Sequence, residues 1–138
     1  MEGPSSIGNG TIDGSVTVQQ GATAHFFGET YIKDGTVTAG NTSIKALADD
    51  APGLLQELTV TDGLIAGTEG RSSLADGLDI RRMGCDLVLE NLILTDNNSI
   101  SVGNGNTITL NNVTIKISDN VAELVGGVYY FKLSNLFH

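Results

Sequence analysis

The chain has 138 residues, of which 18 are glycine, and it carries a formal net charge of −9. This length suits one domain with a modest core, and the acidic balance argues against a nucleic acid partner or an anionic membrane surface. The lone cysteine, Cys85, excludes an intrachain disulfide. The N-terminus lacks the basic start and apolar core of a signal peptide, and no segment approaches the ~18 apolar residues of a membrane span. We therefore expect a protein made in the cytoplasm, without membrane insertion.

In chain order, residues 1–14 are predicted to be an N-terminal extension or cap. Stretches that resemble one another then follow, each with apolar residues at alternating positions before a polar residue. They begin at Val16, Val37, Leu58, Leu87, Ile108 and Phe131. Their successive spacings are 21, 21, 29, 21 and 23 residues. The longest spacing predicts a loop over residues 67–77, and residues 45–57 are compatible with a short helical turn.

A further short strand is predicted before each of the later stretches, at residues 77–82, 99–104 and 122–127. Each coil of the chain would then hold three short strands. Apolar residues at alternate positions of these strands would point inward and stack on their equivalents in the next coil. This pattern is typical of a repeat protein in which one coil cannot bury its own apolar face.

The fifth position of the repeated stretch is Asn or Asp in nearly every copy. Asn tolerates the left-handed backbone region and bonds to its own backbone, so it suits a sharp bend between two strands. Stacked amides can also bond to each other from one coil to the next. The sequence therefore predicts a corner ladder. Its members are Asn41, Asp62, Asn91, Asn112 and Asn135.

These patterns predict a single all-β domain over residues 1–138. The fold would be a right-handed parallel β-helix, or β-solenoid, with coils of about 21 residues whose equivalent strands pair in parallel about 4.8 Å apart. An antiparallel β-sandwich or jelly roll is the alternative, because turn signals every 8 to 12 residues, roughly, would suit that fold as well.

Residues 75–115 resemble the right-handed parallel β-helices of the pectin lyase-like superfamily, and most of all its polygalacturonase branch and phage tailspikes. "ADGLDI" resembles the "NTDGID" strand of that branch, and "DLVLENLIL" resembles the corner that follows it. The resemblance implies a β-helix. It also implies that hydrolysis would need carboxylates on neighbouring coils, one as an acid and others to activate water.

The residues that such an enzyme needs are incomplete in this chain. Asp76 matches the Asp of the first motif, but the paired Asp of the next coil falls on Asn97 and Asn98, which cannot act as acid or base. We therefore expect no catalytic residue, no metal and no cofactor. A polysaccharide hydrolase or lyase, or a fragment of one, is the alternative. It would depend on a cluster of Asp76, Asp79, Asp96 and Arg81.

Aromatic residues gather near the end of the chain, in "VYYFKLSNLF". An exposed apolar strand edge invites pairing with another chain. The sequence therefore predicts an oligomer interface, most simply that of a homotrimer, at this end. Its residues are Tyr129, Tyr130, Phe131 and Phe137.

The expected function is a structural or adhesive one without catalysis. The tailspike resemblance implies an oligomer on a virion or cell surface, as a capsid-decorating or attachment module within a larger protein assembly. A surface polysaccharide is a further expected partner. Besides the enzyme, one more alternative is a cytosolic scaffold that polymerises by end-to-end stacking, as bactofilin-like proteins do.

Overall fold

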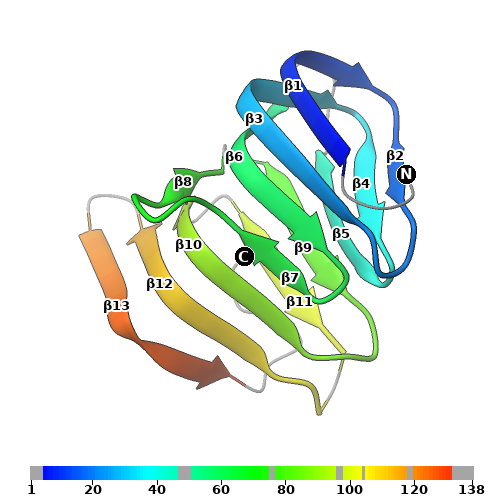
Figure 1. The fold of residues 1–138 in the computed structure, drawn as a ribbon. Helices are drawn as coiled ribbons and strands as arrows, with labels where there is room; N and C mark the ends of the chain where they lie inside the picture. The colour runs from blue at the N-terminus through cyan, green and yellow to red at the C-terminus, as the bar shows by residue number, and fades with distance from the viewer. Residues whose placement is uncertain are drawn as a thin grey trace.

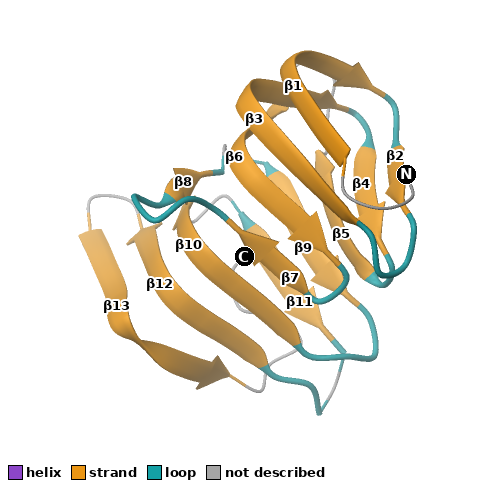
Figure 2. Ribbon diagram, viewed as in Figure 1, coloured by secondary structure: helices purple, strands orange, loops and turns teal. Residues whose placement is uncertain are grey.

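The computed structural model describes residues 5–46, 51–74, 77–95, 98–103, 105–117 and 120–131, and for 117 and 120–131 it describes the backbone. Every regular element in these residues is a β-strand, and none is a helix (Figure 2). The strands form two sheets wound as a β-solenoid with turns about 20 residues apart. The predicted fold class is confirmed, and the chain does not adopt the alternative sandwich.

The larger sheet runs in the order β1, β3, β6, β7, β10, β12, β13, with β8 beside β10 (Figure 1). Its strands are β1 (Ser5–Asp13), β3 (Thr23–Lys33), β6 (Gly53–Thr61), β7 (Leu64–Ala66), β8 (Ser72–Ser73), β10 (Leu87–Thr95), β12 (Ile108–Ile117) and β13 (Asn120–Phe131). The smaller sheet runs in the order β11, β9, β5, β4, β2. Its strands are β2 (Val16–Val18), β4 (Thr36–Ala39), β5 (Thr42–Ala46), β9 (Leu78–Arg82) and β11 (Ser99–Val102).

The apolar core lies between the two sheets, and the long strands of the larger sheet bend around it. The core-facing side chains of β10 are Leu87, Leu89, Leu92 and Leu94. Their alternation shifts by one position at Asn91, which has a φ of 54°. The same shift occurs in β12 at Asn112, which has a φ of 56°. These strands therefore line two faces of the solenoid, and the smaller sheet lines a third.

Parallel pairing with a step of 21 residues occurs where the sequence predicts it in the later coils. In the β10–β12 pair, Leu87 lies opposite Ile108 and Asn91 has Asn112 at the same position of the next coil. The pairs β9–β11, β1–β3 and β2–β4 are parallel as well. Residues 5–13, predicted as an extension or cap, form β1 at the end of the larger sheet.

The prediction that all successive coils pair in parallel is wrong in the middle of the chain. The pairs β3–β6, β4–β5, β5–β9 and β6–β7 are antiparallel. The chain reverses through the two-residue turn at 40–41 and reverses again at 62–63. Strands β5 and β6 therefore form one coil that runs backwards between coils that run forwards. We call this pair of strands the reversed coil.

Three smaller expectations are also corrected. The stretch that begins at Phe131 does not stack in parallel, because β13 is antiparallel to β12 with Phe131 opposite Ile108. Residues 122–127, predicted as a separate strand of a coil, lie within β13. Residues 53–57 lie within β6 and form no helical turn.

Candidate functional site

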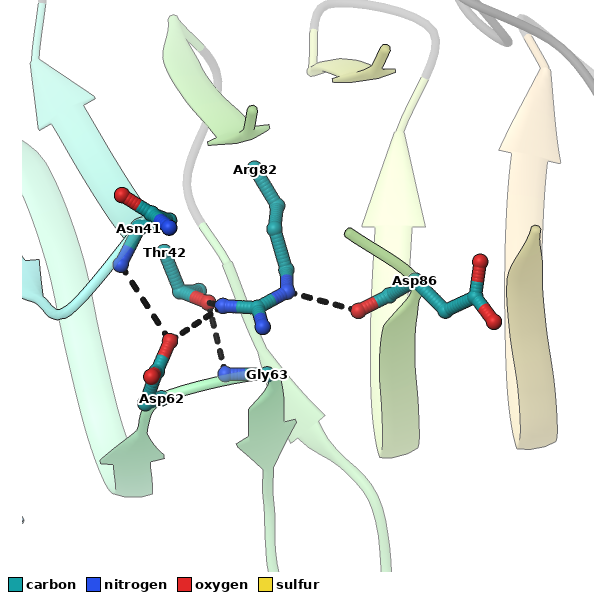
Figure 3. Close-up of polar contacts among 6 residues, drawn as sticks. All are labelled: Asn41, Thr42, Asp62, Gly63, Arg82 and Asp86. Carbon is teal, nitrogen blue, oxygen red and sulfur yellow. Dashed lines mark hydrogen bonds and ion pairs between the residues drawn. The ribbon is translucent and has the colours of Figure 1, made fainter. Parts of the chain in front are cut away.

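Arg82 sits at the centre of a polar cluster that joins several coils (Figure 3). Its position in β9 follows the alternation of Leu78 and Ile80, so its side chain turns inward and is only 10% exposed. Its Nε donates to the carbonyl of Asp86 at 2.6 Å. Its Nη1 donates to Thr42 Oγ1 at 2.8 Å. The same nitrogen forms an ion pair with the carboxylate of Asp62.

The cluster fastens together the two hairpin turns at which the chain reverses. The carboxylate of Asp62 accepts a hydrogen bond from the backbone N–H of Asn41 at 3.2 Å. Thr42 Oγ1 accepts one from the N–H of Gly63 at 2.7 Å. Gly40 has a φ of 59°, and a Cβ built there would lie 2.3 Å from the carboxyl carbon of Asp62. Glycine is therefore required in the first turn for the second turn to pack against it.

The surroundings of Asp62 favour the charged form of its carboxyl. The hydrogen bond from Arg82 is the main cause that lowers the pKa of the Asp62 carboxyl below its ordinary 3.8. The N–H of Asn41 and the charge of Arg82 lower it further, and partial burial acts in the opposite direction. A buried guanidinium needs such a counter-charge, because an unpaired charge at this depth would be costly.

The cluster continues into the next coils through Asp86. Its Oδ1 accepts a hydrogen bond from the backbone N–H of Thr107 at 2.8 Å. The N–H of Met83 donates to the carbonyl of Asn41 at 3.3 Å. The groups around Arg82 therefore link the turn before β5 to the turn before β12. A guanidinium carries several donors in a fixed planar geometry, so Arg82 can hold these turns together as a clamp.

Asn91 and Asn112 lie side by side at the bend of the larger sheet. Both have left-handed φ angles, and Asn112 Nδ2 donates to Asn91 Oδ1 at 2.8 Å. The other predicted corner residues are placed differently. Asn41 and Asp62 lie in the hairpin turns described above, and Asn135 lies outside the described residues.

The row of bends includes residues that the sequence analysis missed. Asn9 and Glu57 each have a φ of 49°, and Gly28 has a φ of 65°. Asn9 Oδ1 accepts from the N–H of Glu29 at 3.2 Å, and Glu57 Oε1 accepts from the N–H of Gly28 at 3.0 Å. Asn9 lies in "GNG", a sequence typical of a turn, so it was not predicted as a bend within a strand. Glu57 was not predicted because Glu has no preference for a left-handed backbone.

The structure describes half of the residues on which an enzyme would depend. Asp79 lies on the outer face of the smaller sheet, where its carboxylate accepts a hydrogen bond from the hydroxyl of Ser99. Arg81, with its side chain 58% exposed, pairs with the same carboxylate at 3.4 Å. Asp76 and Asp96 lie outside the described residues. Among the described residues, no group of three or more His, Cys, Asp or Glu is arranged to hold a metal.

Asn98 is one of the two amides found where the expected catalytic site would need a carboxylate, and its side chain bonds to backbone groups. It is buried, and its Oδ1 accepts a hydrogen bond from the N–H of Thr95 at 2.9 Å. Its Nδ2 donates to the carbonyl of Leu78 in the preceding coil at 3.4 Å. The amide supplies both a donor and an acceptor, which a carboxylate could not do.

The predicted aromatic interface falls at the edge of the larger sheet. The backbones of Tyr129, Tyr130 and Phe131 belong to β13, which is the last strand of that sheet. Phe137 lies outside the described residues. Among the described strands, β13 is therefore the edge strand that carries these residues, and the interface itself stays a prediction.

Comparisons with protein-family models, with curated proteins and with solved structures find no match for this chain. In the part of the chain that the structure describes, no helix is long and apolar enough to cross a membrane. The class that the fold defines is a β-solenoid whose inward and corner polar side chains connect successive coils. Arg82 could have been recognised from the alternation of Leu78, Ile80 and Arg82, which puts the arginine on the inner face of its strand.

Proposed function

We propose that this protein is a non-catalytic structural or adhesive module that works as an oligomer within a larger assembly on a virion or cell surface. The observation that carries the proposal is the use of the polar side chains. Arg82, Asp62, Asn98 and the Asn91–Asn112 pair all bond from one coil to another. Groups so engaged stiffen a solenoid, and they are not free to exchange protons with a substrate.

The carboxylate of Asp79 supports the same proposal. A general acid or a water-activating base in polysaccharide hydrolysis has to reach the sugar. Asp79 is mostly buried and already bonded to Ser99 and Arg81. The resemblance of residues 75–115 to pectin lyase-like β-helices and tailspikes is our reason for proposing a surface location. It supports a module that resembles the superfamily in shape and lacks its chemistry.

The outer face of the smaller sheet is where we place an adhesive contact. Strand pairing aligns one polar residue from each strand across this face. The row consists of Thr17, Thr38, Ser43, Arg81 and Ser101. Hydroxyl and guanidinium groups at regular strand spacing suit hydrogen bonding to an extended sugar chain. A surface polysaccharide is accordingly the ligand class that we propose for this face.

A degradation assay on the full-length protein tests the absence of catalysis. Purified protein would be incubated with neutral and uronate-containing polysaccharides, and released reducing ends and unsaturated products would be measured. We expect no release above the buffer blank, and the same from Asp79→Ala. Release by the wild type that Asp79→Ala abolishes would contradict the proposal and establish the enzyme alternative.

The location has its own test. Antibodies against the recombinant protein would be used to probe particle, envelope and soluble fractions of the producing culture. We expect the protein in the particle or envelope fraction. Recovery in the soluble fraction alone would contradict the surface assignment and favour the cytosolic scaffold.

A further inference from the structure

Among the described residues, the interior of the solenoid is only partly covered at its first coil, which consists of β1 and β2. Of the apolar residues of this coil, Val18 is 1% exposed, whereas Ile7, Ile12 and Val16 pack against the core and are only partly buried. The residues paired with them in the next coil are Phe26, Ile32 and Val37. Those partners are at most 1% exposed. The interior rows that end at Ile7, Ile12 and Val16 are therefore only partly covered by the described residues.

Both strands of the first coil are also edge strands. β1 stands first in the larger sheet and β2 stands last in the smaller one, at the same end of the molecule (Figure 1). Within the described residues, no strand pairs on their outer sides. An edge of this kind offers unpaired backbone N–H and C=O groups to another strand.

The molecule already contains a junction that closes such an edge. The coil of β7 and β9 pairs in parallel with later strands on one side, as the first coil does. On its other side it pairs antiparallel with the reversed coil, and it does so in both sheets. The coil of β3 and β4 also accepts the reversed coil in antiparallel fashion. Neighbouring coils of this solenoid can thus pair in parallel or antiparallel, and both sheets continue across either kind of junction.

Antiparallel stacking requires the bends of the two coils to coincide, and the internal junction meets this requirement. In the β3–β6 pair, the bend at Gly28 lies against the bend at Glu57, and the N–H of Gly28 donates to the Glu57 carboxylate at 3.0 Å. The first coil bends at Asn9, near the middle of β1. Two copies related by a two-fold axis beside Asn9 would align their bends automatically.

The charge pattern favours a second copy as the occupant. Residues 5–22 contain one charged side chain, Asp13, although the whole chain carries a net charge of −9. With the axis beside Asn9, Asp13 of one copy would lie near Ser5 of the other. The first coil is therefore the place where two copies of this acidic chain can approach with the least repulsion.

We propose that the first coil pairs with the first coil of a second copy, head to head and antiparallel in both sheets. The contact would bury Ile7, Ile12 and Val16 and would form a closed two-fold dimer. This inference rests on the proposed structural function, because it names how the module associates. It differs from the predicted trimer, whose contacts lie on the aromatic β13 end.

The solution mass of the full-length protein, measured by light scattering over a range of concentrations, tests the dimer. We expect a species near twice the chain mass of 14.4 kDa. The double variant Ile7→Lys/Ile12→Lys should raise the concentration for half-dimerisation by about tenfold or more, because it places like charges at the junction. The control Gln56→Lys/Thr109→Lys adds the same charge on outer faces away from the first coil and should leave the dimer intact.

Hydrogen exchange on the wild type covers the case in which the lysine variant does not fold. Peptides that include residues 5–18 should gain protection as the protein concentration rises, whereas peptides from residues 108–116 should not. A wild-type monomer, a trimer, or a dimer that the lysine variant leaves unchanged would overturn the head-to-head junction. None of these masses bears on catalysis, and a positive degradation assay would not remove the dimer, so the two proposals fail separately.

Discussion

The coils of β10 and β12 and the reversed coil of β5 and β6 are stabilised in different ways. Between β10 and β12, each position lies against its equivalent in the next coil, and the amides of Asn91 and Asn112 bond directly. Around the reversed coil, the corresponding connection passes through Arg82, which reaches Thr42, Asp62 and Asp86. Parallel stacking spreads stabilisation over many small and similar bonds. At the two turns of the reversal, several bonds converge on one guanidinium and its partly buried ion pair.

The largest expected effect therefore belongs to Arg82→Ala. The change leaves the Asp62 carboxylate, the Thr42 hydroxyl and the Asp86 carbonyl without their guanidinium partner. Because Asp62 keeps 21% of its side chain in solvent, we expect a loss of about 2–4 kcal/mol in the free energy of unfolding, slightly less than is typical of fully buried pairs. Urea unfolding at neutral pH measures it. A loss below about 1 kcal/mol would show that the clamp is not needed for the reversal.

The parallel region should respond less to the loss of one of its bonds. Asn91→Ala removes the amide ladder and places alanine at a φ of 54°. We expect a loss of about 2 kcal/mol, half from the left-handed backbone and half from the hydrogen bond. Asn91→Gly should lose about 1 kcal/mol, because glycine adopts this φ without strain. Equal losses for the two variants would contradict the assignment of Asn91 as a bend.

Asp62→Asn tests the electrostatic part of the clamp. At neutral pH we expect a loss of about 1–2 kcal/mol, because an amide still accepts hydrogen bonds but leaves the buried Arg82 guanidinium without its counter-charge. The pKa of Asp62 is lowered in the folded state, so its stabilising effect is complete above the unfolded value of 3.8 and is lost as the pH falls through the folded value. The stability difference between wild type and variant should therefore shrink on acidification. A difference that is constant with pH would exclude Asp62 as its source.

The smallest expected effect is that of Arg81→Ala, next to Arg82 in the same strand. The side chain of Arg81 is 58% exposed, so the Arg81 end of its ion pair with Asp79 is in contact with solvent. We expect a change of less than about 0.5 kcal/mol in the free energy of unfolding. The variant serves as the matched control for Arg82→Ala. A comparable loss in both would mean that charge removal alone, and not the clamp, destabilises the protein.

The sequence predicts the period of this fold well, because inward apolar residues have to recur each time the chain closes a coil. It does not predict the direction of each coil. The step of 21 residues from Leu87 to Ile108 joins two stacked strands, whereas the equal step from Val37 to Leu58 joins strands of different sheets. A backward coil needs the same length and the same alternation as a forward one. In the sequence, the reversal is indicated only by the short turns Gly40–Asn41 and Asp62–Gly63. Because Asn and Asp occur both at solenoid corners and in hairpin turns, these residues do not distinguish the two.

The candidate site was harder to predict for a related reason. Asp79 and Arg81 drew attention through their residue types, whereas the clamp depends on which of two adjacent arginines faces inward. Which arginine faces inward follows from the alternation of side chains along β9. Two partners of Arg82, Asp62 and Thr42, come from turns about 20 and 40 positions earlier in the chain. Only the three-dimensional path of the reversed coil brings these turns together.

The two tight turns also have a kinetic consequence. The pairs β4–β5 and β6–β7 each close over two residues, whereas the parallel pairs join strands roughly 20 residues apart. Hairpins close in about 1–10 μs, and local contacts form before distant ones because their loops cost less entropy. We expect the middle of the chain to become structured first during refolding, and the forward coils to be added on either side of it. A reversal in the middle of a solenoid would then act as its starting point, from which growth proceeds towards both ends.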